Sequence, residues 1–255
     1  MKTIARIMLG FAVGIAGIDA VGTPQVRAED NPEAILAEAV ELADQGRSNE
    51  AIERLNRVIE LQPKLANAFY LRGRENFRAG KIQASVADFE KLVKLVPRRA
   101  SSLWELGIAY YYAGQYAKGA RQFELYQTYH DNDVENAVWR YLCMAASQGL
   151  EKAREKLLPI ANDPRVPLME IYAMYQGKMT PDEVLSAARR GNPSPRELRA
   201  RLFYAHLYVG LFYEAAGEQD KAEPHIRQAA SEYRIDHYMG DVARLHAQRL
   251  AEKSE

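Results

Sequence analysis

The sequence predicts an all-α protein, a solenoid of tandem antiparallel helix pairs closed by a C-terminal capping helix. Three observations support this fold class. Glycine, small residues and proline recur every 34 residues, which is typical of helical repeat arrays. Apolar positions within each predicted helix recur three and four residues apart, as amphipathic helices require. The 255 residues are 47% hydrophobic and 27% charged, as in ordinary globular proteins.

The first segment, residues 1–28, has the pattern of a secretory signal peptide. Lys2 and Arg6 precede an apolar stretch at 7–18, which is too short to span a bilayer. A Val-Arg-Ala sequence ending at Ala28 supplies small or apolar residues for cleavage after this alanine. We therefore expect an exported protein, periplasmic or secreted. A mature chain from residue 29 keeps 31 basic and 33 acidic residues, a balance that does not favour nucleic-acid binding.

Two alternatives to this N-terminal interpretation remain open. Cleavage after Ala20 would place the bulky Ile18 at the −3 position, and an uncleaved membrane anchor would leave the segment in place. No later segment is apolar enough to cross a membrane. The single cysteine, Cys143, excludes an internal disulfide, and its apolar surroundings predict a buried, inert thiol. No cysteine lies near the end of the apolar stretch, so we expect no lipid anchor at the mature N-terminus.

The regular repeats lie at 29–131, where we expect three helix pairs. Each pair is predicted to turn at a glycine, namely Gly46, Gly80 and Gly114. Small residues allow the two helices to approach closely: Ala39, Gly73 and Gly107 in the first helix, and Ala51, Ser85 and Gly119 in the second. Larger residues fill the interior at Leu55, Phe89 and Phe123. Pro63 and Pro97 end the second helices.

The segment 132–195 is predicted to contain degenerate helical repeats. The fourth unit keeps Ala153 and Leu157 but has Tyr141 where the inner glycine is expected. A helix is predicted to start at Thr180, which can cap it, with proline at its first position. The sequence Gly-Asn-Pro-Ser-Pro at 191–195 is a clear break.

The regular pattern returns within 196–255. A unit beginning at Phe203 keeps four expected residues, Gly210, Tyr213, Gly217 and Ala222. A last helix is expected at 241–250, with Gly240 before it. Its apolar residues Val242, Leu245 and Leu250 would cover the open end of the array, because an uncapped solenoid exposes its core.

The regular units resemble the tetratricopeptide repeat, a helix pair of 34 residues, which implies a right-handed superhelix. The chain also resembles the NlpI-like family of bacterial envelope proteins. Both have regular repeats first, degenerate repeats in the middle and one regular repeat near the end. The segments that carry this resemblance are Tyr70-Leu71-Arg72-Gly73, Trp139-Arg140-Tyr141-Leu142, Tyr172 to Gly177, Thr180 to Leu185, Leu202 to His206 and Gly210 to Tyr213.

The resemblance implies a homodimeric adaptor for peptidoglycan hydrolases and a periplasmic protease. Members of that family are outer-membrane lipoproteins. This sequence has Ala20 and Val21 where their lipidated cysteine would stand, so the implied adaptor is soluble. The particular partners of the family do not follow from the resemblance.

The first helix of each repeat is expected to line a concave groove. The residues at its groove places are Asn67, Tyr70, Arg74, Phe77 and Arg78 in the second repeat, and Ser101, Trp104, Ile108, Tyr111 and Tyr112 in the third. Aromatic residues and arginine dominate protein interfaces, so we predict an exposed protein-binding groove. The alternative is that Trp104 and Tyr111 pack inside the solenoid. Leu36, Val40 and Leu71 stand where a carboxylate-gripping groove needs Lys and Asn, which excludes that activity.

Catalytic and metal-binding patterns are absent from the sequence. No nucleophile elbow, phosphate loop or His-Glu-x-x-His motif occurs. The five histidines, His130, His206, His225, His237 and His246, are expected at the surface or at helix ends rather than as ligands. We therefore predict a non-enzymatic scaffold without cofactor that binds envelope proteins or peptides. A self-associating structural protein and an enzyme of unrecognised type remain alternatives.

Overall fold

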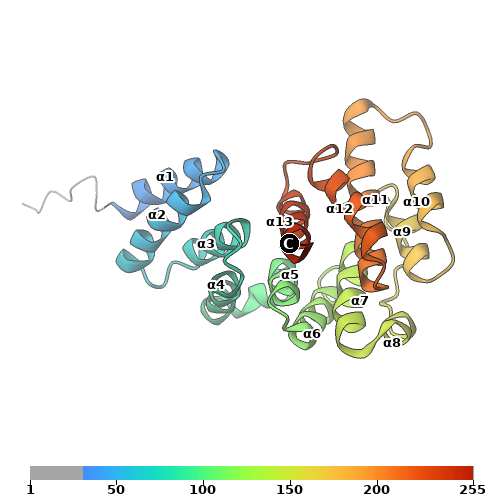
Figure 1. The fold of residues 1–255 in the computed structure, drawn as a ribbon. Coiled ribbons are helices and arrows are strands. Elements are labelled where there is room, and N and C mark those ends of the chain that lie inside the picture. The colour runs from blue at the N-terminus through green and yellow to red at the C-terminus, as the bar shows by residue number, and fades with distance from the viewer. Residues whose placement is uncertain (1–30, 255) are drawn as a thin grey trace, which may run out of the picture.

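The structure is a computed structural model that describes residues 31–254, a range that leaves out the predicted signal peptide. Three regular helix pairs come first (Figure 1). They are α1 (Pro32–Asp44) with α2 (Ser48–Leu61), α3 (Ala66–Arg78) with α4 (Ile82–Leu95), and α5 (Trp104–Tyr112) with α6 (Tyr116–Gln127). A short 3-10 helix, η2 (Pro97–Ser102), joins the second pair to the third. Within the described residues the chain is helical and forms no strand, which confirms the all-α solenoid.

Close helix approach within a pair depends on the small residues predicted for it. A Cβ on Gly107 would lie 2.6 Å from the ring of Phe123, and one on Gly73 would lie 2.8 Å from Phe89. The turn glycine Gly80 adopts a φ of 76°, a left-handed conformation that is unfavourable for residues with a side chain. Its amide donates to Phe77 O at 2.9 Å and so satisfies one of the last carbonyls of α3.

The fourth pair is incomplete. Helix α7 (Val134–Gln148) is regular, but α8 (Leu150–Glu155) ends early, so Leu157 lies beyond it rather than in a full second helix. Three prolines between 159 and 167 explain the ending, because each lacks the backbone N–H that a helix needs. The irregular segment is held by side chains instead, for example by the Tyr172 hydroxyl, which donates to Leu158 O at 2.9 Å.

Two short helices, α9 (Leu168–Tyr175) and α10 (Pro181–Ala188), follow. The predicted start at Thr180 is confirmed, because Thr180 and Glu183 form a reciprocal capping box. Helix α11 (Pro195–Ala215) begins earlier than the unit predicted at Phe203, since Ser194 caps it and Pro195 occupies its first position. It pairs with α12 (Gln219–Ala230).

The last helix, α13 (Tyr238–Ser254), starts before the predicted bounds and includes Gly240. Val242, Leu245 and Leu250 are buried as expected. The helix packs against α12, but it also returns to α3, and Figure 1 shows it inside the curve of the array rather than beyond its end.

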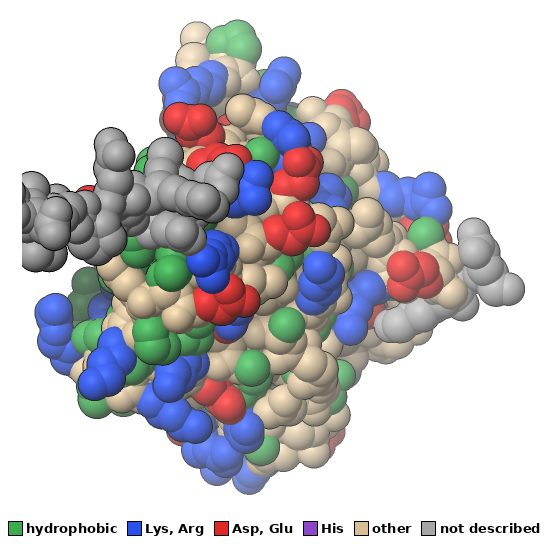
Figure 2. All heavy atoms as spheres, turned by 90° about the vertical axis from the view of Figure 1, so that its left-hand side faces the viewer, with side chains coloured by type: hydrophobic (Ala, Val, Ile, Leu, Met, Phe, Trp, Pro, Cys, Tyr) green, Lys and Arg blue, Asp and Glu red, His purple; other side chains and the backbone are tan. Residues whose placement is uncertain are grey.

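None of the helices at 31–254 is long and apolar enough to cross a membrane. Figure 2 looks onto the α1–α2 end of the molecule. Basic, acidic and hydrophobic side chains are intermixed on that face, with no broad area of one charge. This mixture agrees with the formal net charge of zero and differs from the continuous basic surface that nucleic-acid binding requires.

Candidate protein-binding groove

The predicted groove residues lie on α3 and α5, but most of them are covered. Of the nine predicted groove residues on these two helices, only Asn67 is exposed, whereas Phe77, Ile108 and Tyr112 are buried. The others are half-buried, namely Tyr70, Arg74, Arg78, Trp104 and Tyr111. Ser101, at the first groove place of the third repeat, lies in η2 and is half-buried. The expectation of an exposed set of aromatics is therefore corrected, and the reason is α13.

Aromatic side chains join α13 to the inner faces of α3 and α5. The ring of Tyr238 stacks on Phe77 with centroids 5.1 Å apart. It also meets Trp104 edge-on at 5.3 Å. The guanidinium of Arg74 lies 5.3 Å from the same tyrosine centroid, within the range of a cation–π contact. Three of the predicted groove residues, Arg74, Phe77 and Trp104, thus contact α13 of the same chain.

Three arginines cap the first helices of the three regular repeats. Arg78 Nη1 donates to Ala43 O, near the end of α1, at 2.8 Å. Arg244 Nη2 donates to the carbonyl of Arg78, the last residue of α3, at 2.6 Å. Arg249 Nη1 donates to the carbonyl of Tyr112, the last residue of α5, at 3.0 Å. Cations at helix C-termini satisfy orphan carbonyls and complement the helix dipole, so α13 supplies two of the three caps.

A polar chain of three side chains ties α13 to both sides of the curve. Tyr112 Oη lies 2.8 Å from His246 Nδ1, and His246 Nε2 lies 2.8 Å from Glu214 Oε2 on α11. Burial, with Tyr111 and Glu214 adding to it, raises the pKa of Tyr112 well above its ordinary value. The phenol therefore stays protonated. His246 and His206 are both buried, so the expected surface or helix-end location is wrong for these two histidines.

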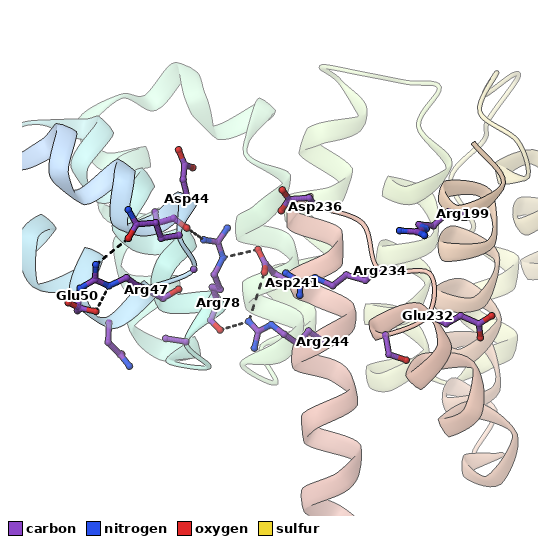
Figure 3. Close-up of a pocket in the computed structure, with 17 residues that line it drawn as sticks. Asp44, Arg47, Glu50, Arg78, Arg199, Glu232, Arg234, Asp236, Asp241 and Arg244 are labelled. Atoms are coloured by element: carbon purple, nitrogen blue, oxygen red, sulfur yellow. Dashed lines mark hydrogen bonds and ion pairs between the residues drawn. The ribbon is translucent and has the colours of Figure 1, made fainter. Parts of the chain in front are cut away.

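A wide cleft of about 1180 Å³ lies between the α1–α2 turn and the start of α13 (Figure 3). Five arginines and five acidic residues line it, so its charge is balanced. Arg78 Nε donates to Asp241 at 3.0 Å across the cleft, and Arg47 pairs with Glu50 on its rim. The contact between Arg78 and Asp241 holds α13 against the second repeat.

A second pocket remains open on the concave side, between α5, α6 and α7. We call it the inner pocket. It has a volume of about 290 Å³. Both tryptophans of the chain, Trp104 and Trp139, line it, together with Ile108. His237 and Met239, at the start of α13, close one edge. The groove is thus filled along α3 and open beside α7.

One arginine and two carboxylates, Arg165, Asp133 and Glu135, form the polar wall of the inner pocket, and a third carboxylate, Asp163, pairs with the arginine. Arg165 donates to Asp133 at 2.7 Å, to Glu135 at 2.8 Å and to Asp163 at 2.6 Å. The Tyr208 hydroxyl donates to Glu135 at 2.6 Å. Burial and then the charge of Asp133 raise the pKa of Glu135 to about 7, against the opposing effect of Arg165. The hydrogen bonds from Arg165 hold the pKa of Asp163 below its ordinary value despite burial.

Two buried polar atoms of α7 have no hydrogen-bond partner within the described residues. They are Oδ1 of Asn136 and Nε1 of Trp139, and both residues line the inner pocket. The other end of the Asn136 amide is fixed, since Nδ2 donates to Phe123 O at 3.1 Å and to Gln127 Oε1 at 2.9 Å. Buried polar groups are rarely left without partners, so each of these two atoms keeps an unused hydrogen-bonding capacity.

Sequence reasoning placed Trp104 and Ile108 at this site but missed its polar wall. Asp133, Glu135 and Asn136 lie at the start of α7, in the degenerate unit, where repeat places no longer identify groove positions. Arg165 comes from the irregular segment after α8. The Asp133 cap of α7 is a local signal that could have located the helix start. Within 31–254 no group of histidine, cysteine and acidic residues is arranged to hold a metal ion.

Comparisons with known proteins agree with this architecture. Residues 36–100 and 70–133 match the family model of the tetratricopeptide repeat. No similar protein was found among the curated sequences. The chain is similar to a solved structure of MamA, at 20% identity over 65% of this chain and 80% of that one, with a TM-score of 0.47. It is also similar to MamA from Desulfovibrio magneticus, at 15% identity over 81% of this chain and 97% of that one, with a TM-score of 0.49.

A third solved structure is YrrB, described as a tetratricopeptide-repeat protein with an unusual peptide-binding site. It is 16% identical over 87% of this chain and 93% of that one, with a TM-score of 0.45. The finer resemblance to the NlpI-like family is not confirmed by these comparisons and stays a prediction. The repeat model and the helix pairs together show that residues 36–133 are tetratricopeptide repeats within an all-α solenoid.

Proposed function

We propose that this protein is a scaffold that binds other proteins or peptides on its concave side, at the inner pocket. Tetratricopeptide repeats typically mediate protein–protein interactions. The observation that carries the proposal is that α13 fills the groove along α3 but leaves the pocket beside α7 open, with two tryptophans in its wall. Tryptophan is enriched among the residues that dominate protein interfaces.

The size of the α13 contact explains why the site is the inner pocket. Five large apolar side chains of α13 are buried, namely Tyr238, Met239, Val242, Leu245 and Leu250. At about 1.5–3 kcal/mol each, their exposure would cost about 8–15 kcal/mol. A partner with micromolar affinity gains about 8 kcal/mol in total, so it does not displace the helix.

We further propose that the protein works in the bacterial cell envelope, after export directed by residues 1–28. Its partners would be envelope proteins such as cell-wall hydrolases or proteases. It would form a homodimer, as the family resemblance implies. The signal-peptide pattern supports export, and the resemblance to envelope proteins supports the class of partner.

Site-specific photo-crosslinking tests the proposal. A photoreactive phenylalanine analogue replaces His130, which is exposed at the pocket rim, and Ala87, which is exposed on α4, serves as the matched control position. We expect crosslinks to envelope proteins from His130 and none of the same products from Ala87. Equal products from both positions, or products formed only with a second copy of the chain, would contradict a scaffold acting through the inner pocket.

A further inference from the structure

Resting on the proposed function, we infer that the inner pocket binds an extended peptide segment through the main-chain N–H and C=O of one residue and an adjacent lysine or arginine side chain. The starting point is the pair of partnerless atoms on α7. Asn136 and Trp139 are three residues apart, so they lie on the same side of the helix. Asn136 Oδ1 is an acceptor and Trp139 Nε1 is a donor. The main-chain N–H and C=O of one residue in an extended peptide point to the same side and present the complementary donor and acceptor.

The charge of the pocket wall selects the side chain beside this amide. Asp133, Glu135 and Asp163 surround a single cation, Arg165, so their ionised forms leave an excess of negative charge. Each carboxylate oxygen can accept more than one hydrogen bond, so the ion pairs with Arg165 leave capacity for another donor. A second cation close to Asp133 and Glu135 is therefore favoured, and an acidic side chain is repelled.

Aromatic rings complete the recognition of a cation. The half-buried Trp104 and the buried Trp139 form the pocket walls, with Phe123 and Tyr126 behind them. Ammonium and guanidinium groups are attracted to aromatic faces, most strongly to tryptophan. The volume of about 290 Å³ lies at the lower end of ligand pockets, so it suits one long side chain rather than a large ligand.

The binding should depend on pH through Glu135. Its raised pKa, about 7, means that the carboxylate ionises as the pH rises from 6 to 8. The groups that face it are Asp133 and Arg165 from the pocket wall and Tyr208 from α11, and the histidines that line the pocket are His130 and His237. Protonation of Glu135 removes a negative charge from the pocket wall and disfavours a cationic ligand, so binding should weaken as the pH falls.

The two tryptophans give a direct test, because both line the pocket and the chain has no others. Their indole N–H signals in ¹⁵N-labelled protein from residue 29 onward are followed during titration with short capped glycine–serine peptides. The peptides differ only at one central residue, which is lysine, arginine, norleucine or glutamate. We expect the lysine and arginine peptides to shift both signals and to bind about tenfold more tightly than the norleucine peptide.

Matched variants assign the effect to the carboxylates. Glu135→Gln and Asp133→Asn should each bring the affinity for the lysine peptide close to that for the norleucine peptide, and Glu135→Gln should also remove the pH dependence. Asparagine caps helices as well as aspartate, so Asp133→Asn keeps the start of α7. Glu53→Gln, at an exposed position on α2, should change nothing.

Norleucine or glutamate peptides that bind as tightly as the lysine peptide would overturn the inference, as would unshifted indole signals at millimolar concentrations of all four peptides. The inference can fail in this way while crosslinks from His130 still identify a partner. The proposed scaffold would then stand with a different ligand chemistry. Absence of crosslinks would instead contradict the scaffold itself.

Discussion

At the scale of single residues, the close contacts between glycine and aromatic rings fix the spacing of each helix pair. Gly107 has no room for a Cβ, because the ring of Phe123 already fills that space. Gly73 and Phe89 make the same contact in the second repeat, so the second and third repeats fix their helix spacing in the same way. Sequence reasoning could predict these contacts, since both partners lie within one repeat and their spacing recurs.

Gly107→Ala is expected to lower the free energy of unfolding by about 1–3 kcal/mol, because overpacking outweighs the gain in helix propensity. Urea unfolding measures the loss. Adding Phe123→Leu should recover part of it, since the smaller side chain makes room for the new methyl group. Strictly additive losses in the double variant would show that the two residues do not compete for space.

A close pair of histidines makes stability depend on pH. His206 is buried, its Nδ1 lies 2.9 Å from Nδ1 of His225, and its ring stacks on Tyr233. Burial, with the charges of His225 and Arg189 adding to it, lowers the pKa of His206 to about 4. An unfolded chain has histidine pKa values near 6.5 and binds the proton more readily. The free energy of unfolding should therefore fall by about 3 kcal/mol as the pH drops from 6.5 to 4, and this group adds no further loss below pH 4.

Urea unfolding at pH 7.5 and at pH 5 checks this dependence. His206→Phe should reduce the difference in stability between the two pH values, because it removes the histidine whose pKa is lower in the folded state than in the unfolded state. His130→Gln is the matched control at an exposed position and should keep the difference. An unchanged difference in His206→Phe would mean that other groups cause the pH dependence.

At the scale of secondary-structure elements, α13 decides how the concave side is used. The helix supplies caps to α3 and α5, stacks an aromatic ring on α3 and reaches α11 through His246. Its existence could be predicted from local apolar spacing. Its position could not, because it depends on contacts such as that between Arg78 and Asp241, which no repeat period relates.

Tyr238→Ala is expected to destabilise the fold by about 3–5 kcal/mol, since it removes a buried ring that packs on Phe77 and Trp104. Thermal unfolding followed by circular dichroism provides the measurement. Glu252→Ala, at an exposed position near the end of the same helix, should change the free energy of unfolding by less than about 0.5 kcal/mol. Equal effects of the two substitutions would argue that α13 contributes little to the folded core.

At the scale of the whole molecule, a curved array of repeats folds around its own C-terminal helix and leaves the inner pocket open. The regular repeats could be predicted because the 34-residue period reports local packing. The inner pocket could not, since its polar wall joins Glu135 in a degenerate unit to Arg165 in an irregular segment and Tyr208 on α11. The proposed binding therefore falls on the α5–α7 part of the concave side.

Native-state hydrogen exchange tests most directly whether α13 is a permanent part of the fold. If it is, the amides at 242–250 should exchange only through global unfolding, with the same opening free energy as the buried amides of α3 and α5. That result would leave the inner pocket as the open part of the groove. Opening of α13 at a markedly lower free energy, with α3 and α5 still protected, would show that the full groove becomes accessible and would contradict the account.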